Sequence, residues 1–474
     1  MNQLPEELYR RIDEIIESLT GEVVSSAQDI VQLKSVKAPS RPGMPFGEGV
    51  DACYRHALAL SQQLGFSTVD VDGYGGHAET GHGEEIVGIL GHLDVMPEGV
   101  GWTYPPYGAE IHDGVIYGRG IADDKGAIIA SMYAIVALQR AGVSFSKRVR
   151  VIFGLDEESG MASVRAYLAR EEEPDVAFTP DGAFPAIHGE KGIFTFRLRR
   201  SNTDGERHGE GLEIVSIQGG RRSNVVPDFC EARIRDRDGI FDELSRAVER
   251  ADDDLTVARG DDGCVVVKAF GVPAHGASPA AGINAISKLL LFLNTQPIAS
   301  RSLAEVIDFY CRAIGSESDG QSLGCGLKDE ESGALTLNVG VIKVDGEMID
   351  ILCNIRYPVT ATLAEVSDPI TTAAEAAGLE LVYLSHQDPL YIPQESLLVR
   401  SLMKAYQDVT GDYETAPMVI GGGTYAKAVR NCIAFGPGFP GVPSNGHQAD
   451  ERMRVDHLVA CTRIYARAIY ELLQ

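Results

Sequence analysis

The 474-residue sequence has no paired cysteines and no apolar segment near its start. Its eight cysteines are scattered between positions 53 and 461 and never form a CxxC pair. This pattern favours reduced, mostly buried thiols over a disulfide framework. The first residues, MNQLPEELYRRIDEIIESL, contain no basic segment followed by an apolar run. We therefore expect neither a signal peptide nor a transmembrane helix, and we expect a cytoplasmic protein.

Positive charge is scarce. Lys and Arg number 42 against 68 Asp and Glu, so the formal net charge is −26, and the isoelectric point is near 4.8. Such a surface repels phosphate groups, which argues against nucleic acids and anionic membranes as partners. Solubility is the simplest reason for the excess, although local groups of carboxylates could bind metal ions.

The rest of the composition excludes several classes of protein. Apolar residues make up 44% of the chain and charged residues 23%, which is ordinary for a globular protein and fits neither general disorder nor a fibre. We find no short-period repeat. The length exceeds that of one ordinary core and predicts two or three domains.

Strand and helix patterns alternate in the first part of the chain. The segments EEIVGILGHLDV, RVRVIFGLDEES and DVAFTPDGA are each a short apolar run that ends in polar residues, and KGAIIASMYAIVALQRAG has a helical pattern. This alternation is typical of an α/β layer with a largely parallel sheet. Sites in such sheets form at the carboxyl ends of the strands, so the polar motifs that follow these strands are expected to converge.

The pattern becomes β-rich near residue 187 and returns to α/β near residue 386. Segments such as FTFRLRR and LTLNVGVIKVDGEMIDILCNIRYP predict strands, and ISKLLLFLNT predicts a helix. We therefore predict an α/β domain made of residues 1–186 and 386–474, with a mostly parallel sheet flanked by helices. A large α+β domain, residues 187–385, is inserted into it.

Two motifs near the first strand carry metal-binding side chains. In GHLDVMPEG, His92 and Asp94 are two residues apart and point the same way at a strand end; His is a common ligand, and a carboxylate beside it can fix its tautomer. In GRGIADDKG, Asp123 and Asp124 are adjacent like charges, which are costly without a cation or donors. Each motif alone is equally compatible with a polar strand end or a capped helix start.

Three further motifs follow the same design. LDEESG places Glu157 and Glu158 after an apolar strand, TPDGAFP places Asp181 after another, and NGHQADE places His447 in a loop. In the presence of a metal, one carboxylate of the first motif can bind it while its neighbour serves as general base. Alone, these residues could equally be a solvated helix start and a surface His.

Together the motifs supply two His and several carboxylates at consecutive strand or loop ends. These mixed nitrogen and oxygen ligands suit Zn²⁺ or Mn²⁺ and do not suit a thiolate site. Five or six ligands exceed the needs of one tetrahedral zinc. Two metals that share a bridging carboxylate is the economical interpretation.

The five motifs, in this order, resemble the M20 family of metallopeptidases, and most closely its bacterial dipeptidase branch. The resemblance covers residues from about 90 to 450. It implies a catalytic domain of the zinc-exopeptidase type with an inserted lid. It also implies specific roles: His92 and Asp181 on one metal, Asp123 bridging, Glu158 and His447 on the second, Asp94 orienting His92, and Glu157 as general base. It further implies a cis Asp123–Asp124 bond.

The predicted lid carries further residues of the family pattern. By resemblance, His275 reaches the scissile carbonyl, while Arg356 and Asn224 bind the substrate carboxylate. Gly422, Gly423 and Thr424 form a backbone loop along the substrate in the returning domain. A planar Arg fork matches a free carboxylate bidentately, which suits very short peptides.

These residues predict an enzyme that hydrolyses unblocked dipeptides with two divalent ions, Zn²⁺ or Mn²⁺ and possibly Co²⁺. A small peptide is then the partner. The long insert resembles that of the dipeptidase branch, whose enlarged lid supplies the second half of the site within one chain, so the resemblance implies a monomer. The alternatives are an N-acyl or N-succinyl amino acid deacylase of the same family and a non-catalytic, metal-stabilised binding protein. One departure from the family is Asp450, where the pattern HQxNE has Asn; an acceptor there replaces a donor.

Overall fold

The computed structural model of the chain describes residues 3–202, 211–237, 239–251 and 254–474. The chain forms two compact units. The first unit comprises Met1–Gly189, Tyr391–Val419 and Gly423–Gln474, and the inserted unit comprises Glu190–Leu390 and Ile420–Gly422. The inserted unit thus also contains a short piece of the returning chain, which the sequence pattern did not indicate.

The first unit is built on one large sheet with the order β1-β2-β6-β3-β7-β22-β9-β20, and β21 pairs with β9. The strands β6, β3, β7 and β22 are parallel to one another, while β1–β2, β2–β6 and β22–β9 pair antiparallel. The sheet is therefore parallel at its centre and antiparallel towards its margins. The bounds are β1 Ser67–Asp70, β2 Gly76–Thr80, β3 Ile86–His92, β6 Arg148–Gly154, β7 Val176–Thr179, β9 Ile187–Glu190, β20 Leu390–Tyr391, β21 Met418–Ile420 and β22 Cys432–Ala434.

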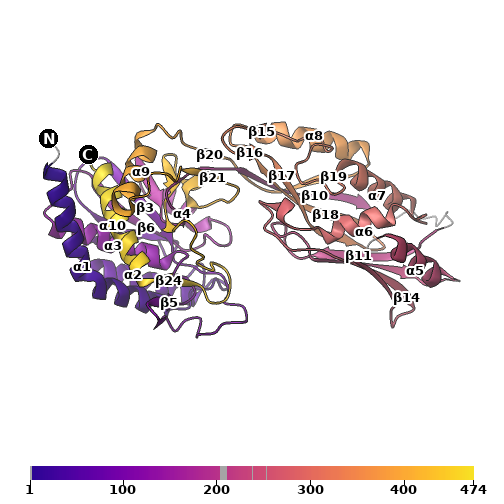
Figure 1. Cartoon of the computed structure of the whole chain (residues 1–474), viewed down its shortest axis with the longest axis horizontal. Helices are drawn as coiled ribbons and strands as arrows, with labels where there is room; N and C mark the ends of the chain where they lie inside the picture. The colour runs from indigo at the N-terminus through magenta and orange to yellow at the C-terminus, as the bar shows by residue number, and fades with distance from the viewer. Residues whose placement is uncertain (1–2, 203–210, 238, 252–253) are drawn as a thin grey trace. The chain divides into compact units, whose positions relative to one another are not determined.

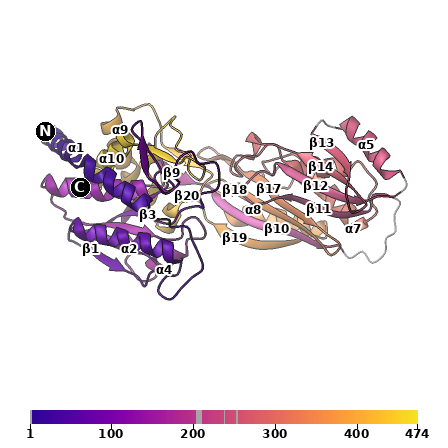
Figure 2. The same ribbon diagram turned by 90° about the horizontal axis from the view of Figure 1, so that it is seen from below.

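Helices cover the central strands. Every residue of β3 is buried, as expected for a parallel strand with helices on both faces. The helix α3 is buried along almost its whole length, and it packs against α1 and α10 (Figure 1), while α2 contacts β1 and β2 (Figure 2). The bounds are α1 Gln3–Val31, α2 Glu48–Gln63, α3 Lys125–Arg140, α4 Ala162–Leu168, α9 Leu397–Thr410 and α10 Val455–Leu472. None of the described helices is long and apolar enough to cross a membrane.

Short strands fix the loops of the first unit. The strand β23 pairs with β8, and β24 pairs with β5, which in turn pairs with β4. These pairings hold the late segment of the chain, which contains His447, beside segments that precede α3 and follow β7. The bounds are β4 Glu110–His112, β5 Val115–Tyr117, β8 Gly182–Ala183, β23 Pro437–Gly438, β24 Arg452–Arg454 and the 3₁₀ helix η2 Tyr425–Ala428.

The inserted unit contains a second sheet, ordered β13-β14-β12-β11-β17-β18-β10-β19. Buried and half-buried residues alternate along β10 and β12, because one face packs with the helices into a single apolar core. The predicted helix at 286–295 is α6. The bounds are β10 Gly192–Ser201, β11 Ile214–Gly220, β12 Phe229–Arg235, α5 Ile240–Ala251, β13 Leu255–Arg259, β14 Cys264–Phe270, η1 Pro279–Ala281, α6 Ala285–Leu293, α7 Arg301–Ala313, β15 Lys328–Asp329, β16 Gly333–Ala334, β17 Thr336–Val344, β18 Met348–Tyr357, α8 Leu363–Ala376 and β19 Glu380–Gln387.

The predicted fold class is confirmed. An α/β layer with a parallel centre and a large inserted α+β unit both follow from the patterns read above. The antiparallel margins of the first sheet were not predicted, since β1 and β2 are short and their alternation of burial is weak.

Candidate metal centre

The predicted ligands lie where strands of the first sheet end. His92 is the last residue of β3, Asp181 follows β7, and Glu158 follows β6. Asp123 lies in the turn before α3, and its peptide bond to Asp124 is cis. Because parallel strands end at one edge of the sheet, side chains from distant parts of the sequence meet there.

Within the described residues, these side chains form two groups that share one carboxylate. The first group is His92, Asp123 and Asp181, and the second is Asp123, Glu158 and His447; within each group the ligand atoms lie within 4.8 Å of one another. His92 Nε2 is 2.9 Å from Asp123 Oδ1, and His447 Nε2 is 2.9 Å from Asp123 Oδ2. Each oxygen of Asp123 therefore faces a different histidine.

The remaining distances are also short. His92 Nε2 is 3.9 Å from Asp181 Oδ2, and His447 Nε2 is 3.0 Å from Glu158 Oε1. Two imidazoles and three carboxylates at these separations are donors of the kind that Zn²⁺ and Mn²⁺ prefer. The residues present therefore fit divalent cations.

The cluster perturbs its own titration. Hydrogen bonds to Asp123 and Glu158 raise the pKa of His447 to about 10. Burial opposes ionisation of Asp123, but His447 and His92 outweigh it and hold the pKa of that carboxyl well below its usual range. Perturbed groups that gather at one edge of a sheet are typical of functional sites.

Asp94 holds the loop of Glu157 and Glu158. Its carboxylate accepts hydrogen bonds from the Glu157 amide at 3.1 Å and from the Glu158 amide at 3.2 Å. His92 Nδ1 lies 2.9 Å from the Asp94 main-chain oxygen but 3.6 Å from its carboxylate. The sequence suggested that the Asp94 carboxylate orients His92; in the structure the Asp94 main-chain oxygen lies nearer to Nδ1, and the Asp94 side chain is among the groups that raise the pKa of the His92 ring.

Glu157 is half-buried beside other carboxylates. Burial, followed by the charge of Asp181, raises the pKa of Glu157 well above its ordinary value. A carboxylate with a raised pKa is a stronger base than an ordinary one, and this is the direction required of a general base and acid.

Sequence analysis missed the buried pair of Glu451 and Arg119. Glu451 Oε1 accepts hydrogen bonds from the amides of three residues of the loop that ends at Asp123, at 2.9, 3.0 and 3.2 Å. Glu451 Oε2 is 2.6 Å from Arg119 Nη1, and the two side chains are 0% and 1% exposed. The pair fixes the backbone that presents Asp123. The only signal was the acidic end of HQADE together with the Arg of GRG.

Asp450, the departure from the family pattern, also tethers a loop. Its Oδ1 accepts a hydrogen bond from the Thr103 amide and its Oδ2 from the Thr103 hydroxyl, both at 2.7 Å. Both bonds require an acceptor at Asp450. The Asp at position 450, where the family pattern has Asn, thus uses both of its oxygens as acceptors for Thr103.

The inserted unit brings His275 and Asn224 onto neighbouring segments. Gly276 donates its amide to the Asn224 carbonyl at 2.7 Å, and His275 forms an isolated bridge with Val225. The buried Asn338 donates from its side-chain nitrogen to the carbonyls of Ser223 and Val225, at 2.7 and 3.0 Å. The hydrogen bonds of Asn338 therefore fix the backbone on both sides of Asn224.

Arg356 is buried and has neutral partners. It is 6% exposed, its Nε donates to Asn354 Oδ1 and its Nη1 donates to the Gly421 carbonyl, both at 2.9 Å. Burial lowers its pKa to about 10. Among the described residues, no carboxylate is within ion-pair distance of this guanidinium, so its charge can be matched by an anion from outside the chain.

The predicted glycine loop divides between the units. Gly422 belongs to the inserted unit, whereas Gly423 and Thr424 belong to the first unit. Thr424 caps η2 by accepting the Ala426 amide on its Oγ1 at 3.1 Å. The structure thus gives Thr424 a local role in the backbone.

Comparisons with known proteins agree with this architecture. Residues 88–471 match the peptidase family M20/M25/M40. The chain is 37% identical over 459 residues to the Bacillus subtilis protein named "Putative dipeptidase YtjP", covering 95% of this chain and 97% of that one. It is 33% identical over 464 residues to "Putative dipeptidase SH1171" of Staphylococcus haemolyticus, covering 97% and 98%.

Solved structures share the fold. Human carnosine dipeptidase 1 aligns with a TM-score of 0.59 at 16% identity, covering 98% of this chain and 99% of that chain. Dug1p from Saccharomyces cerevisiae, titled a di-peptidase, aligns with a TM-score of 0.58 at 14% identity, covering 98% of each chain.

The fold and the cluster together define a metal-dependent hydrolase that acts on peptide bonds. The chain belongs to peptidase family M20/M25/M40. The resemblance read from the five motifs is thereby confirmed.

Proposed function

We propose that the chain is a dipeptidase that works with two divalent cations. The observation that carries this proposal is the shared carboxylate of Asp123, whose two oxygens face different histidines in two ligand groups. Its relatives at 37% and 33% identity are named as dipeptidases. The ligation tolerates Zn²⁺, Mn²⁺ or Co²⁺, and availability decides among them.

His92 and Asp181 would hold one cation, Glu158 and His447 the other, and Asp123 both. When bound, the cations supply Lewis acidity and lower the pKa of water. A histidine binds a metal as a neutral imidazole. In the metal-free protein, hydrogen bonds to Asp123 favour the protonated form of His92 and His447, so metal binding would displace those protons. Binding should therefore release protons and weaken as the pH falls.

Glu157 is the proposed general base. Its backbone amide is bound by Asp94, and its half-buried carboxyl group lies beside the ligand groups. In the proposed reaction Glu157 accepts a proton from the attacking water and later donates it to the leaving amine.

The inserted unit would supply recognition. Arg356 is the proposed receptor for the free carboxylate of the substrate, because its buried charge has only neutral described partners. We assign Asn224 to the same carboxylate and His275 to the oxyanion. Loss of one oxyanion donor typically costs on the order of 10²–10³ in rate. Gly422, Gly423 and Thr424 would line the substrate through their backbone, and we expect one chain to be sufficient for activity.

The test is a hydrolysis assay on metal-stripped protein. Zn²⁺ or Mn²⁺ is added, and a free dipeptide, its N-acetyl form and a tetrapeptide are compared. Cleavage of the free dipeptide alone, restored by metal, is the expected result. Cleavage of the acetylated compound would instead indicate a deacylase, and metal binding without any cleavage would indicate a binding protein.

A matched pair of variants tests recognition. Arg356→Met should lower kcat/KM for the free dipeptide by about 100-fold, since an uncompensated carboxylate loses a charge-assisted partner. The same substitution should lower kcat/KM far less for the dipeptide amide, which has no carboxylate for Arg356 to bind. The control is Arg400→Met, an exposed Arg on α9. Equal losses on both substrates would contradict the role of Arg356.

A further inference from the structure

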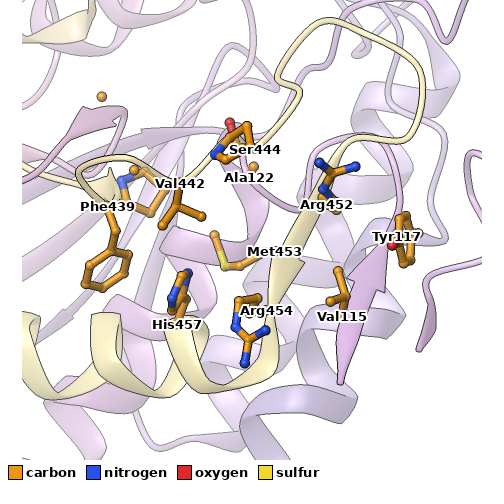
Figure 3. Close-up of a pocket in the computed structure, with 14 residues that line it drawn as sticks. Val115, Tyr117, Ala122, Phe439, Val442, Ser444, Arg452, Met453, Arg454 and His457 are labelled. Atoms are coloured by element: carbon orange, nitrogen blue, oxygen red, sulfur yellow. The ribbon is translucent and has the colours of Figure 1, made fainter. Parts of the chain in front are cut away.

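A cavity lies in the first unit, close to the ligand groups. Its volume is about 270 Å³, slightly below the roughly 300–1,000 Å³ typical of sites for drug-sized ligands. It is formed by β5, β24, the start of α10 and the chain that follows β23 (Figure 3). A cavity of this size suits a ligand of a few heavy atoms, such as an amino-acid side chain.

The cavity shares its walls with the metal-binding loops. Ala122 and Gly182 line it, and each is the direct neighbour of a predicted ligand, Asp123 and Asp181. Ser444 lines it as well. A Cβ placed on Gly446 would lie 3.9 Å from both Asp123 Oδ2 and Ser444 Oγ. The Ser444 hydroxyl, which lines the cavity, and the shared carboxylate of Asp123 therefore both border the space beside Gly446.

One cation in the cavity wall makes no ion pair with a described residue. Arg452 on β24 is half-buried, and no carboxylate of the described residues lies within ion-pair distance of it. The carboxylate of the nearby Asp450 accepts its hydrogen bonds from Thr103. The charge of Arg452 acts on it only as the last of the causes that lower its pKa. Arg454, by contrast, is paired with Asp456 at 2.6 Å.

Neutral donors accompany this cation. Tyr117 on β5 is the cross-strand partner of Arg452, so the two side chains project from the same face of the small sheet, as Figure 3 shows. Burial is the first cause that lowers the pKa of His457, which leaves a neutral ring at pH 7 whose N–H can donate. The His457 ring packs on Phe439 with centroids 4.6 Å apart.

The rest of the wall is apolar. Val442, Phe439 and Met453 also line the cavity (Figure 3). Apolar walls with one open guanidinium and several hydroxyl or ring donors complement a short aliphatic chain that ends in a carboxylate. In a protein with a net charge of −26, a guanidinium that lines a cavity without a described ion pair is a specific feature.

We propose that this cavity binds the carboxylate of an aspartate or glutamate side chain of the substrate, with Arg452 as its partner. The proposal rests on the proposed function, because it places the substrate's backbone at the ligand groups and its side chain in the cavity. The same chemistry could come from a free short dicarboxylate, and the experiment separates the two sources.

The first arm compares acidic dipeptides with their amide isosteres. Asp-Ala and Glu-Ala are measured against Asn-Ala and Gln-Ala, and the reversed sequences identify the substrate position. We expect kcat/KM to favour the acidic member of one series by about 10-fold or more, which is the scale of one charge-assisted hydrogen bond. Arg452→Met should bring this ratio close to one, Arg452→Lys should retain part of it, and Arg400→Met should leave it unchanged.

The second arm does not depend on hydrolysis. Glutarate is titrated into the metal-loaded protein and into Arg452→Met by calorimetry. If no dipeptide is cleaved, the proposed function fails while glutarate binding still tests the cavity. Glutarate binding lost in Arg452→Met, without any acidic preference in the first arm, would assign the cavity to a free dicarboxylate. An acid-to-amide ratio near one together with no glutarate binding would overturn the proposal.

Discussion

The buried carboxylate of Glu451 gives a prediction whose size can be worked out from the structure. Glu451→Ala removes the acceptor for the three loop amides and for Arg119. Because both side chains are almost fully buried, the change leaves an uncompensated guanidinium and unsatisfied amides near Asp123.

The free energy of unfolding should fall by about 3–5 kcal/mol, the usual cost of breaking a buried ion pair from one side. Each amide left without a partner would add about 1–3 kcal/mol. The loop can rearrange and recruit water, however, so we expect the total loss to stay within about 3–5 kcal/mol. A residue that positions a metal ligand typically changes metal affinity by about 10–100-fold. We expect that loss as well, since the loop amides held by Glu451 include that of Asp123.

The assay combines urea unfolding with calorimetric titration of Mn²⁺. Glu79→Ala is the matched control, because Glu79 on β2 pairs at 2.7 Å with the buried Arg150. Arg150 lies near the amino end of β6, whereas the ligands follow the carboxyl ends of the strands. The control should lose stability and keep its metal affinity. Glu451→Gln should fall between wild type and Glu451→Ala, since it retains an acceptor but loses the charge. A Glu451→Ala protein with metal affinity within twofold of wild type would refute the positioning argument.

Three further predictions follow from other residues. Glu157→Gln should bind two metal equivalents as the wild type does and lose at least about 10³-fold in kcat; loss of a metal equivalent would contradict its role as base. Chelation should lower the melting temperature, which should then rise with added Mn²⁺ because only the folded chain presents the ligands; a melting temperature independent of Mn²⁺ would argue against the site. His77, whose neutral ring accepts from the Tyr167 hydroxyl at 2.8 Å, should make stability depend on pH. Burial and then the charges of Arg150 and Arg148 lower its pKa to about 3, so between pH 6.5 and 3 the unfolded chain binds a proton that the folded chain does not. Its contribution should be lost as the pH falls through that window, by at most about 1.4 kcal/mol per pH unit, and urea unfolding of His77→Gln should lack this component.

The ligand groups could be predicted because one rule governs them. His92 ends one short apolar strand and Glu158 and Asp181 follow two others, and parallel strands end at a common edge. The apolar runs were long enough to identify those strands, and the glycines around Asp123 indicated a tight loop. Local patterns and the family order of motifs therefore pointed to the same residues.

What could not be predicted depends on pairing across the fold. Nothing local shows that Glu451 meets Arg119, which is 332 positions away. The main-chain contact of Asp94 with His92 depends on the path of the loop, and a sequence pattern carries no information on it. The assignment of Gly422 and Gly423 to different units likewise depends on contacts between segments far apart in sequence.

The place of β22 in the first sheet has a consequence for biosynthesis. This strand lies between β7 and β9 but is made about 250 residues after β7. At roughly 5–20 residues per second, the β7 edge that pairs with β22 stays unpaired for some 10–50 s while the whole inserted unit is synthesised. An unpaired, apolar strand edge is a template for wrong pairing. The nascent chain therefore exposes an incomplete sheet during this period. Slow elongation through the insert would lengthen the time in which the exposed edge can aggregate.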